Sequence, residues 1–194
     1  MRPEKRIEWL AMPDLSLKDK QKLIELARAA IKTCLEGDPR VVVADFPALQ
    51  EKCGCFVTLR KQGSLRGCVG TFDTSKPLYE NIQRMAVAAA TQDARFSPVT
   101  KSELDEMRIE ISVLGPLEKV ESLEEIQLGT HGVYVRYGNR SGTFLPDVAI
   151  EKKWNVAEFV TVCAREKAGL TPAEIQKAEI FRYEVVKINE DETR

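Results

Sequence analysis

The segment 53–70 constrains the fold of this chain more than any other part of the sequence. It contains three of the five cysteines and four of the eleven glycines. Apolar side chains alternate with largely polar ones in residues 55–60 and again in residues 65–69, which is the period of two that a half-buried strand needs. Residues 62–64, Gln-Gly-Ser, separate the two runs. The pattern predicts an antiparallel hairpin with a tight turn.

The register of this hairpin decides which side chains reach the core, because a shift of one residue turns every side chain of a strand to the other face. A three-residue loop places Lys61 opposite Leu65 and Thr58 opposite Cys68. A two-residue loop would mix the charge of Arg66 into the apolar face, and we therefore predict the three-residue loop. The expected apolar face consists of Cys55, Val57, Leu59, Leu65 and Val69, and the other face of Thr58, Arg60, Arg66 and Cys68.

Two interpretations of the motif Leu65-Arg66-Gly67-Cys68-Val69-Gly70 stay open. Glycines weaken a strand and often mark a bulge or a close approach to the main chain, which draws attention to Gly67 and Gly70. In the functional interpretation, Arg66 holds an anion and its guanidinium favours the reactive thiolate of Cys68. In the structural interpretation, Cys68 is a small buried side chain of a turn-rich strand.

The composition predicts a globular protein without a membrane segment. Of the 194 residues, 43% are hydrophobic and 30% are charged, and no apolar run approaches the roughly 20 residues that span a bilayer. The basic start, residues 1–6, has no apolar stretch behind it, so we expect no secretory signal and a cytoplasmic location. Five cysteines is an odd number, which favours reduced thiols over a disulfide framework.

The cysteine spacing does not predict a metal site. Cys53, Cys55 and Cys68 could supply three thiolates, but the chain has no Cys-x-x-Cys pair and its single histidine, His131, is far away in the sequence. We therefore expect neither a metal nor another cofactor. The net charge of −1, from 29 basic and 30 acidic residues, argues against general attraction to nucleic acids.

The remaining sequence alternates helical and strand patterns. Residues 16–36 predict an amphipathic helix with Ser16 as N-cap and Gly37 after its end, and residues 45–47 begin an extended lead-in to the hairpin. Further helices are predicted at 77–92, 100–103, 155–168 and 171–174, and strands at 108–113, 117–120, 131–137, 141–145 and 178–188. Hairpins dominate over crossovers, so we predict an α+β fold with a mainly antiparallel sheet flanked by helices.

Five motifs in this order resemble the AMMECR domain family, named for a chromosomal region linked to Alport syndrome, mental retardation, midface hypoplasia and elliptocytosis. They are Leu65-Arg66-Gly67-Cys68-Val69-Gly70, Asp93-Ala94-Arg95-Phe96, His131-Gly132-Val133, Leu145-Pro146-Asp147-Val148-Ala149 and Lys167-Ala168-Gly169-Leu170. In the first motif Val69 stands where the family has isoleucine. Asp147 stands where the family usually has glutamine, which puts a hydrogen-bonding role of that position in doubt.

The resemblance implies an α+β fold and one AMMECR-type domain over residues 1–194, with a larger lobe built from both chain ends and a smaller lobe from the middle. It implies no known reaction and no cofactor. In many microbes the family is associated with a Memo-type protein, related in fold to extradiol dioxygenases, and with a radical S-adenosylmethionine protein. These two proteins are therefore the expected partners.

Three functions fit the candidate residues, and whether the protein is an enzyme stays open. The first is a binding or accessory protein whose pocket, lined by Arg66, Cys68 and Arg95, accepts an anionic small molecule or a partner segment. The second is an enzyme with Cys68 as nucleophile and His131 as base. The third is a nucleic-acid-associated regulator. We favour the first, because a single histidine limits acid–base chemistry near neutral pH.

Each function assigns roles to particular side chains. In the enzyme, Asp93 or Asp147 orients the histidine, and the amides of Gly67 or Gly70 stabilise an oxyanion. Arg95 either pairs with Asp93 or faces an anion. The regulator requires a cluster of Arg60, Lys61, Arg66 and Arg95. The candidate catalytic residues are Cys68 and His131, and the candidate binding residues are Thr58, Arg66, Gly67, Gly70, Asp93, Arg95, Phe96 and Asp147.

Overall fold

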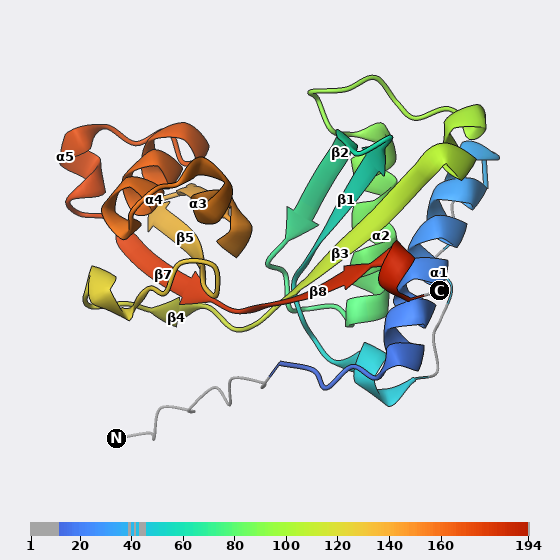
Figure 1. The fold of residues 1–194 in the computed structure, drawn as a ribbon, viewed down its shortest axis with the longest axis horizontal. Coiled ribbons are helices and arrows are strands. Elements are labelled where there is room, and N and C mark those ends of the chain that lie inside the picture. The colour runs from blue at the N-terminus through green and yellow to red at the C-terminus, as the bar shows by residue number, and fades with distance from the viewer. Residues whose placement is uncertain (1–11, 39, 41, 43–45, 194) are drawn as a thin grey trace. The chain divides into compact units, whose positions relative to one another are not determined.

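The computed structural model describes residues 12–38, 40, 42 and 46–193. The chain divides into two compact units, each with its own hydrophobic core. The larger unit consists of Met1–Leu114 and Val186–Arg194, and the smaller unit of Gly115–Val185. Figure 1 shows the elements of both units.

Two helices of the larger unit form as the sequence predicts. Helix α1, Leu17–Leu35, starts with a capping box in which the Ser16 hydroxyl accepts a hydrogen bond from the Asp19 N–H and the Asp19 carboxylate accepts one from the Ser16 N–H. Helix α2 spans Leu78–Thr91. Both bury an apolar stripe, formed by Leu23, Ile24, Leu26, Ala27, Ala30 and Ile31 in α1 and by Leu78, Ile82, Ala86 and Ala89 among others in α2. Packing of these stripes builds the larger core.

The sheet of the larger unit has the strand order β2-β1-β3-β8. Its strands are β1 Cys55–Lys61, β2 Ser64–Thr71, β3 Met107–Leu114 and β8 Val185–Asn189. Strand β1 pairs antiparallel with both β2 and β3. Alternate side chains of β1 and β3 are buried in the core with α1 and α2, which lie on one side of the sheet (Figure 1). Strand β2 therefore forms an outer edge of the sheet.

The β1–β2 hairpin differs from the predicted register. Lys61 pairs with Ser64, so the loop has two residues, Gln62 and Gly63, and both have positive φ, 51° and 79°. A positive φ at both central positions is typical of the type I′ hairpin turn. The predicted three-residue loop is wrong, because a bulge in β2 supplies the extra residue.

The bulge lies in β2 opposite Leu59 and Arg60 of β1, and Arg66 is its unpaired residue. On the side of the bulge away from the turn, Thr58 pairs with Cys68, as predicted. On the turn side, Leu65 pairs with Arg60 and is 37% exposed, so its predicted place in the apolar face is wrong.

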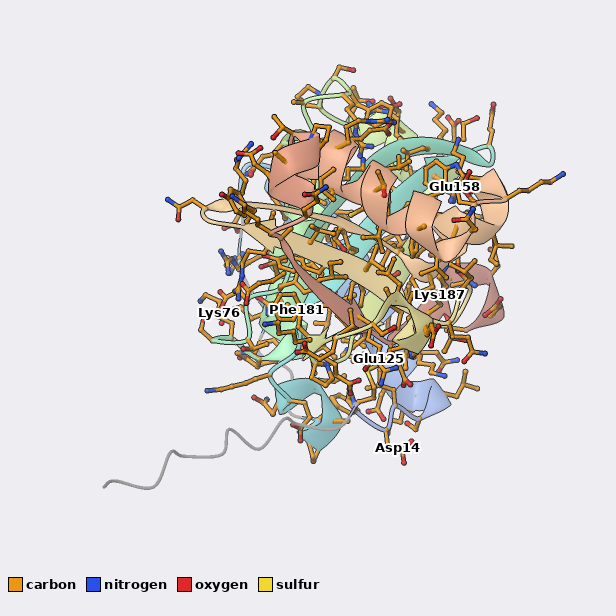
Figure 2. All side chains as sticks on the ribbon, turned by 90° about the vertical axis from the view of Figure 1, so that its left-hand side faces the viewer. Asp14, Lys76, Glu125, Glu158, Phe181 and Lys187 are labelled. Carbon is orange, nitrogen blue, oxygen red and sulfur yellow. The ribbon has the colours of Figure 1, made fainter. Side chains whose placement is uncertain are left out.

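The smaller unit contains a second antiparallel sheet, with the order β4-β7-β5-β6. Its strands are β4 Glu118–Lys119, β5 Gly132–Tyr137, β6 Arg140–Phe144 and β7 Glu179–Tyr183. Helices α3 Pro146–Lys152, α4 Val156–Val162 and α5 Pro172–Ile175 complete it, with a π-helical turn, η4 Cys163–Lys167, after α4. Phe181 of β7, labelled in Figure 2, contacts Tyr134 edge to face at 6.0 Å between ring centroids.

Short 3-10 helices occupy several loops: η1 Pro47–Gln50, η2 Lys101–Glu106, η3 Leu123–Glu125 and η5 Glu190–Glu192. Helix η1 replaces part of the extended lead-in predicted from residue 45, which itself lies outside the described residues. The strand predicted at 178–188 is divided between β7 and β8, which belong to different sheets. The α+β class with antiparallel sheets flanked by helices is confirmed. No helix in the described part of the chain combines the length and apolar character that crossing a membrane requires.

Candidate functional site

Cys68 lies on the outer strand β2, on the sheet face that points away from α2. A Cβ on the neighbouring Gly67 would collide with the main-chain oxygen of Ala89 in α2, so Gly67 faces that helix. Successive side chains of a strand point to opposite faces, which turns Cys68 away from it. The Thr58 hydroxyl donates a hydrogen bond to the Cys68 sulfur at 3.2 Å. The thiol is half-buried and has a polar neighbour of its own.

The main chain of Cys68 is held from outside the sheet. Its N–H donates to Asp93 Oδ2 at 2.8 Å, and its carbonyl oxygen accepts from Arg95 Nη2 at 3.2 Å. An outer strand presents main-chain groups that no neighbouring strand satisfies. The loop after α2 supplies both missing partners at this one residue.

Asp93 and Arg95 also bind each other. Arg95 donates from Nε to Asp93 Oδ1 at 2.9 Å and from Nη2 to Asp93 Oδ2 at 2.7 Å. These bonds, with the N–H groups of Cys68 and Arg95, hold the pKa of Asp93 well below its usual range. The Arg95 guanidinium lies 5.5 Å from the centroid of the Phe96 ring. Arg95 thus takes the structural one of its two predicted roles, the pair with Asp93.

Arg66 is bound by a carboxylate too. Its guanidinium donates to both oxygens of Glu103, at 3.2 and 3.1 Å, and to the main-chain oxygen of Ser97 at 2.8 Å. The Arg66 guanidinium and the Thr100 N–H lower the pKa of Glu103 to about 2. Glu103 was not predicted as a site residue. The capping-box pattern of Thr100 and Glu103 fixed only its local position, and its partner is 37 residues away.

Steric crowding explains why the motif has glycine at both positions. Gly67 allows the main chain of α2 to approach β2, and a Cβ on Gly70 would overlap the ring of Phe56. Phe56 in turn contacts Phe72 edge to face at 6.0 Å. Direct roles of Gly67 and Gly70 in binding stay predictions.

The other cysteines are less accessible or lie elsewhere. Cys53, Cys55 and Cys163 are buried, and Cys34 is half-buried in α1. Burial raises the pKa of Cys53 to about 11 and that of Cys163 to about 12, and it raises the pKa of Cys55 as well. A raised pKa leaves these three thiols protonated and unreactive near neutral pH.

His131 and Asp147 belong to the smaller unit, whereas Cys68 belongs to the larger one. The Nδ1 atom of His131 accepts a hydrogen bond from the Gln127 N–H at 2.9 Å. Burial, and next the charge of Arg182, lower the pKa of His131, so the ring is neutral near pH 7. Asp147 lies in the first turn of α3. A catalytic pair of Cys68 and His131 stays a prediction.

The four cations proposed for nucleic acid binding all have carboxylate partners. The pairs are Arg60 with Glu110 at 2.7 Å, Lys61 with Glu103 at 3.4 Å, Arg66 with Glu103 at 3.1 Å and Arg95 with Asp93 at 2.7 Å. Within the described ranges, no three His, Cys, Asp or Glu side chains are grouped so that they could hold a metal ion.

Comparison with known proteins agrees with the resemblance seen in the motifs. The AMMECR1 family profile matches residues 24–188. Protein MJ0810 of Methanocaldococcus jannaschii is 36% identical, over 93% of this chain and 94% of its own length. Protein MK0488 of Methanopyrus kandleri is 42% identical, over 81% of both chains.

The fold also has a solved counterpart. The crystal structure of the uncharacterized protein PH0010 from Pyrococcus horikoshii matches with a TM-score of 0.80 and 34% identity. The match covers 87% of this chain and 89% of PH0010. The family match and the structural match each cover most of the chain, and the chain belongs to the AMMECR1 family.

Proposed function

We propose that this protein is a binding or accessory component whose partner contacts the Cys68 side of strand β2. The observation that carries the proposal is the way Cys68 is held: Asp93 and Arg95 bind its main chain, and Thr58 donates to its sulfur. A partly exposed side chain fixed in this way is preorganised, which reduces the entropy lost on binding.

The charges around Cys68 favour a partner segment over an anionic small molecule. Both nearby guanidinium groups, those of Arg66 and Arg95, already bind carboxylates of the chain itself. An anion would have to compete with Glu103 and Asp93 for them. A neutral protein segment against Cys68 needs no such exchange.

The partners we propose are the Memo-type and radical S-adenosylmethionine proteins that the family association implies, acting in the cytoplasm, where free thiols persist. The test uses purified chains from one organism and measures the dissociation constant of each pair. Replacing Cys68 by Leu places extra bulk on the proposed surface and should weaken binding at least about tenfold, a loss of about 1.4 kcal/mol.

The matched control is Cys34→Leu. Cys34 is also half-buried, but it lies on α1. This variant should leave the dissociation constant unchanged if it folds, which its unfolding transition checks. Equal affinity of wild type and Cys68→Leu for both partners would refute the proposal.

A covalent enzyme is the second candidate, and the hydrogen bond from Thr58 to the Cys68 sulfur favours it, because a donor to sulfur stabilises a thiolate. Site-resolved iodoacetamide labelling across pH tests it. Labelling of Cys68 that stays fast well below the ordinary thiol pKa of about 8.5, and slows in Thr58→Val, supports the enzyme. A Cys68 that stays unlabelled in the folded protein excludes covalent catalysis.

Nucleic acid binding is not part of the proposal. It requires cations free to replace counterions on the phosphate backbone. The four arginines and lysines that the hypothesis needs are each paired with a carboxylate.

A further inference from the structure

We propose that Asp93 and Arg95 are positioning residues that hold Cys68 in place, and that neither is a contact for the ligand. The inference rests on the proposed function, since it takes Cys68 as the point of contact. It reassigns two of the candidate binding residues.

The hydrogen bonds of Asp93 carry this inference. Oδ1 accepts from the N–H and Nε of Arg95, and Oδ2 accepts from the N–H of Cys68 and Nη2 of Arg95. A carboxylate has about four acceptor sites, so all of them are used. The carboxylate is also only 6% exposed. Asp93 therefore has neither the acceptor capacity nor the exposure to bind a ligand.

The loop that contains Asp93 and Arg95 is attached to β2 at a second point. Arg66, two residues before Cys68, donates to the main-chain oxygens of Ser97 and Pro98 at 2.8 and 3.4 Å. In Figure 1 this loop, the light-green segment after α2, passes beside the hairpin end of β1 and β2. The segment 93–98 thus runs along the edge of β2 and is bound to it at residues 66 and 68.

Arg95 acts through the same bonds. Its side chain is 53% exposed, yet its Nη2 atom bridges the Asp93 carboxylate and the Cys68 carbonyl oxygen. Because a guanidinium presents its donors in a fixed planar fork, lysine cannot reproduce this bridge although it keeps the charge. Arg95→Lys therefore separates positioning from simple charge.

The test measures the alkylation rate of Cys68 with two probes of similar size, neutral iodoacetamide and anionic iodoacetate, in wild type, Asp93→Asn and Arg95→Lys. Asp93→Asn leaves one neutral acceptor oxygen in place of the charged pair, and Arg95→Lys removes the planar fork, so both variants weaken the bonds to the Cys68 main chain. We expect iodoacetamide labelling to rise about tenfold, as for loss of one charge-assisted hydrogen bond. Asp93→Asn also frees the Arg95 charge, which attracts the anionic probe. In this variant the ratio of the iodoacetate rate to the iodoacetamide rate should therefore rise above that of wild type.

Three controls accompany the measurement. Cys34 in the same chain should keep its rate in every variant. Arg136→Lys alters a comparable exposed pair with Glu179 in the smaller unit and should not change Cys68 labelling. The buried Cys53, Cys55 and Cys163 report unfolding, because they label only in a variant that has lost its fold.

Unchanged Cys68 labelling in both folded variants would overturn the inference. So would weaker partner binding in Asp93→Asn with unchanged labelling, because Asp93 would then contact the partner itself. Failure of the proposed function gives a different result. Cys68→Leu would then bind its partners normally, while Asp93→Asn and Arg95→Lys would still raise the labelling rate of Cys68. If Asp93→Asn does not fold, Arg95→Lys decides alone.

Discussion

Two hairpins in the described part of the chain, β1–β2 and β5–β6, have the same feature on their outer strands. In each, a glycine lets a helical segment approach the strand: Gly67 of β2 faces Ala89 of α2, and Gly142 of β6 faces Lys167 and Ala168 at the end of η4. A Cβ at either position would collide with main-chain atoms. Close packing of helix on strand is therefore a requirement common to both units.

The hairpins differ in the side chains that bind the main chain of the outer strand. At β2 the partners are charged, namely the buried carboxylate of Asp93 and the half-exposed guanidinium of Arg95 at Cys68. At β6 the partner is neutral and buried: the Tyr183 hydroxyl donates to the Phe144 carbonyl oxygen at 3.1 Å, and burial raises the pKa of Tyr183. The bonds to the Cys68 main chain should thus respond to pH and salt, whereas the bond from Tyr183 to the Phe144 carbonyl oxygen should not.

The largest expected effect concerns the glycines at which a helical segment packs closely on the outer strand. Gly67→Ala should lower the free energy of unfolding by about 3 kcal/mol, because the added methyl group meets main-chain atoms of α2 that cannot move aside cheaply. Gly142→Ala should cost a similar amount. Urea unfolding at pH 7 measures both.

The control is Gly63→Ala in the turn of β1–β2. It has φ +79° and nothing within 4 Å of an added Cβ, so it pays only the conformational cost of about 1 kcal/mol. A Gly67→Ala variant as stable as Gly63→Ala would mean that α2 can move away from β2 at little cost. The requirement for a glycine at the helix–strand contact would then not be common to the two hairpins.

A second, smaller effect tests the charged character of the β2 edge. Glu103→Gln removes the carboxylate partner of Arg66 and should cost about 2 kcal/mol at pH 7. The folded-state pKa of Glu103, about 2, lies below its ordinary value of 4.5. The stability from this carboxylate is therefore present above about pH 4.5 and is lost as the pH falls toward about 2.

Unfolding experiments from pH 7 to pH 2 check this sign. The difference in stability between wild type and Glu103→Gln should shrink with falling pH. Tyr183→Phe, which removes the neutral bond of β6, should cost the same amount throughout this range, since a phenol does not titrate there. A pH-independent effect of Glu103→Gln would erase the distinction between the two edges.

The parts of the fold that local patterns determine were predictable from the sequence. Helices α1 and α2 follow from apolar stripes and from the Ser16 cap, and the pairing of Thr58 with Cys68 follows from strand alternation. The pair of Asp93 and Arg95 was one of two predicted alternatives, because residues two apart in a turn can bind each other locally.

The missed features depend on residues distant in the sequence. The bulge at Arg66 lets that side chain reach Glu103 and the main chain of residues 97–98, and no local pattern indicates those partners. Likewise the continuous strand pattern of 178–188 contains no turn signal, yet β7 and β8 pair with different sheets. Tertiary hydrogen bonding decided both outcomes.

The smallest expected effect tests the bulge itself. Leu65→Thr should change the free energy of unfolding by less than about 0.5 kcal/mol, because Leu65 is 37% exposed and lies opposite Arg60. In the three-residue register Leu65 would be in the core, and the same substitution would cost about 2 kcal/mol or more. Leu59→Ala, at a fully buried position, should cost about 3 kcal/mol and shows the scale of a true core site. A large loss of stability in Leu65→Thr would instead support the three-residue loop. Arg66 would then be paired in the regular ladder, without the bulge on which its bonds to Ser97 and Pro98 depend.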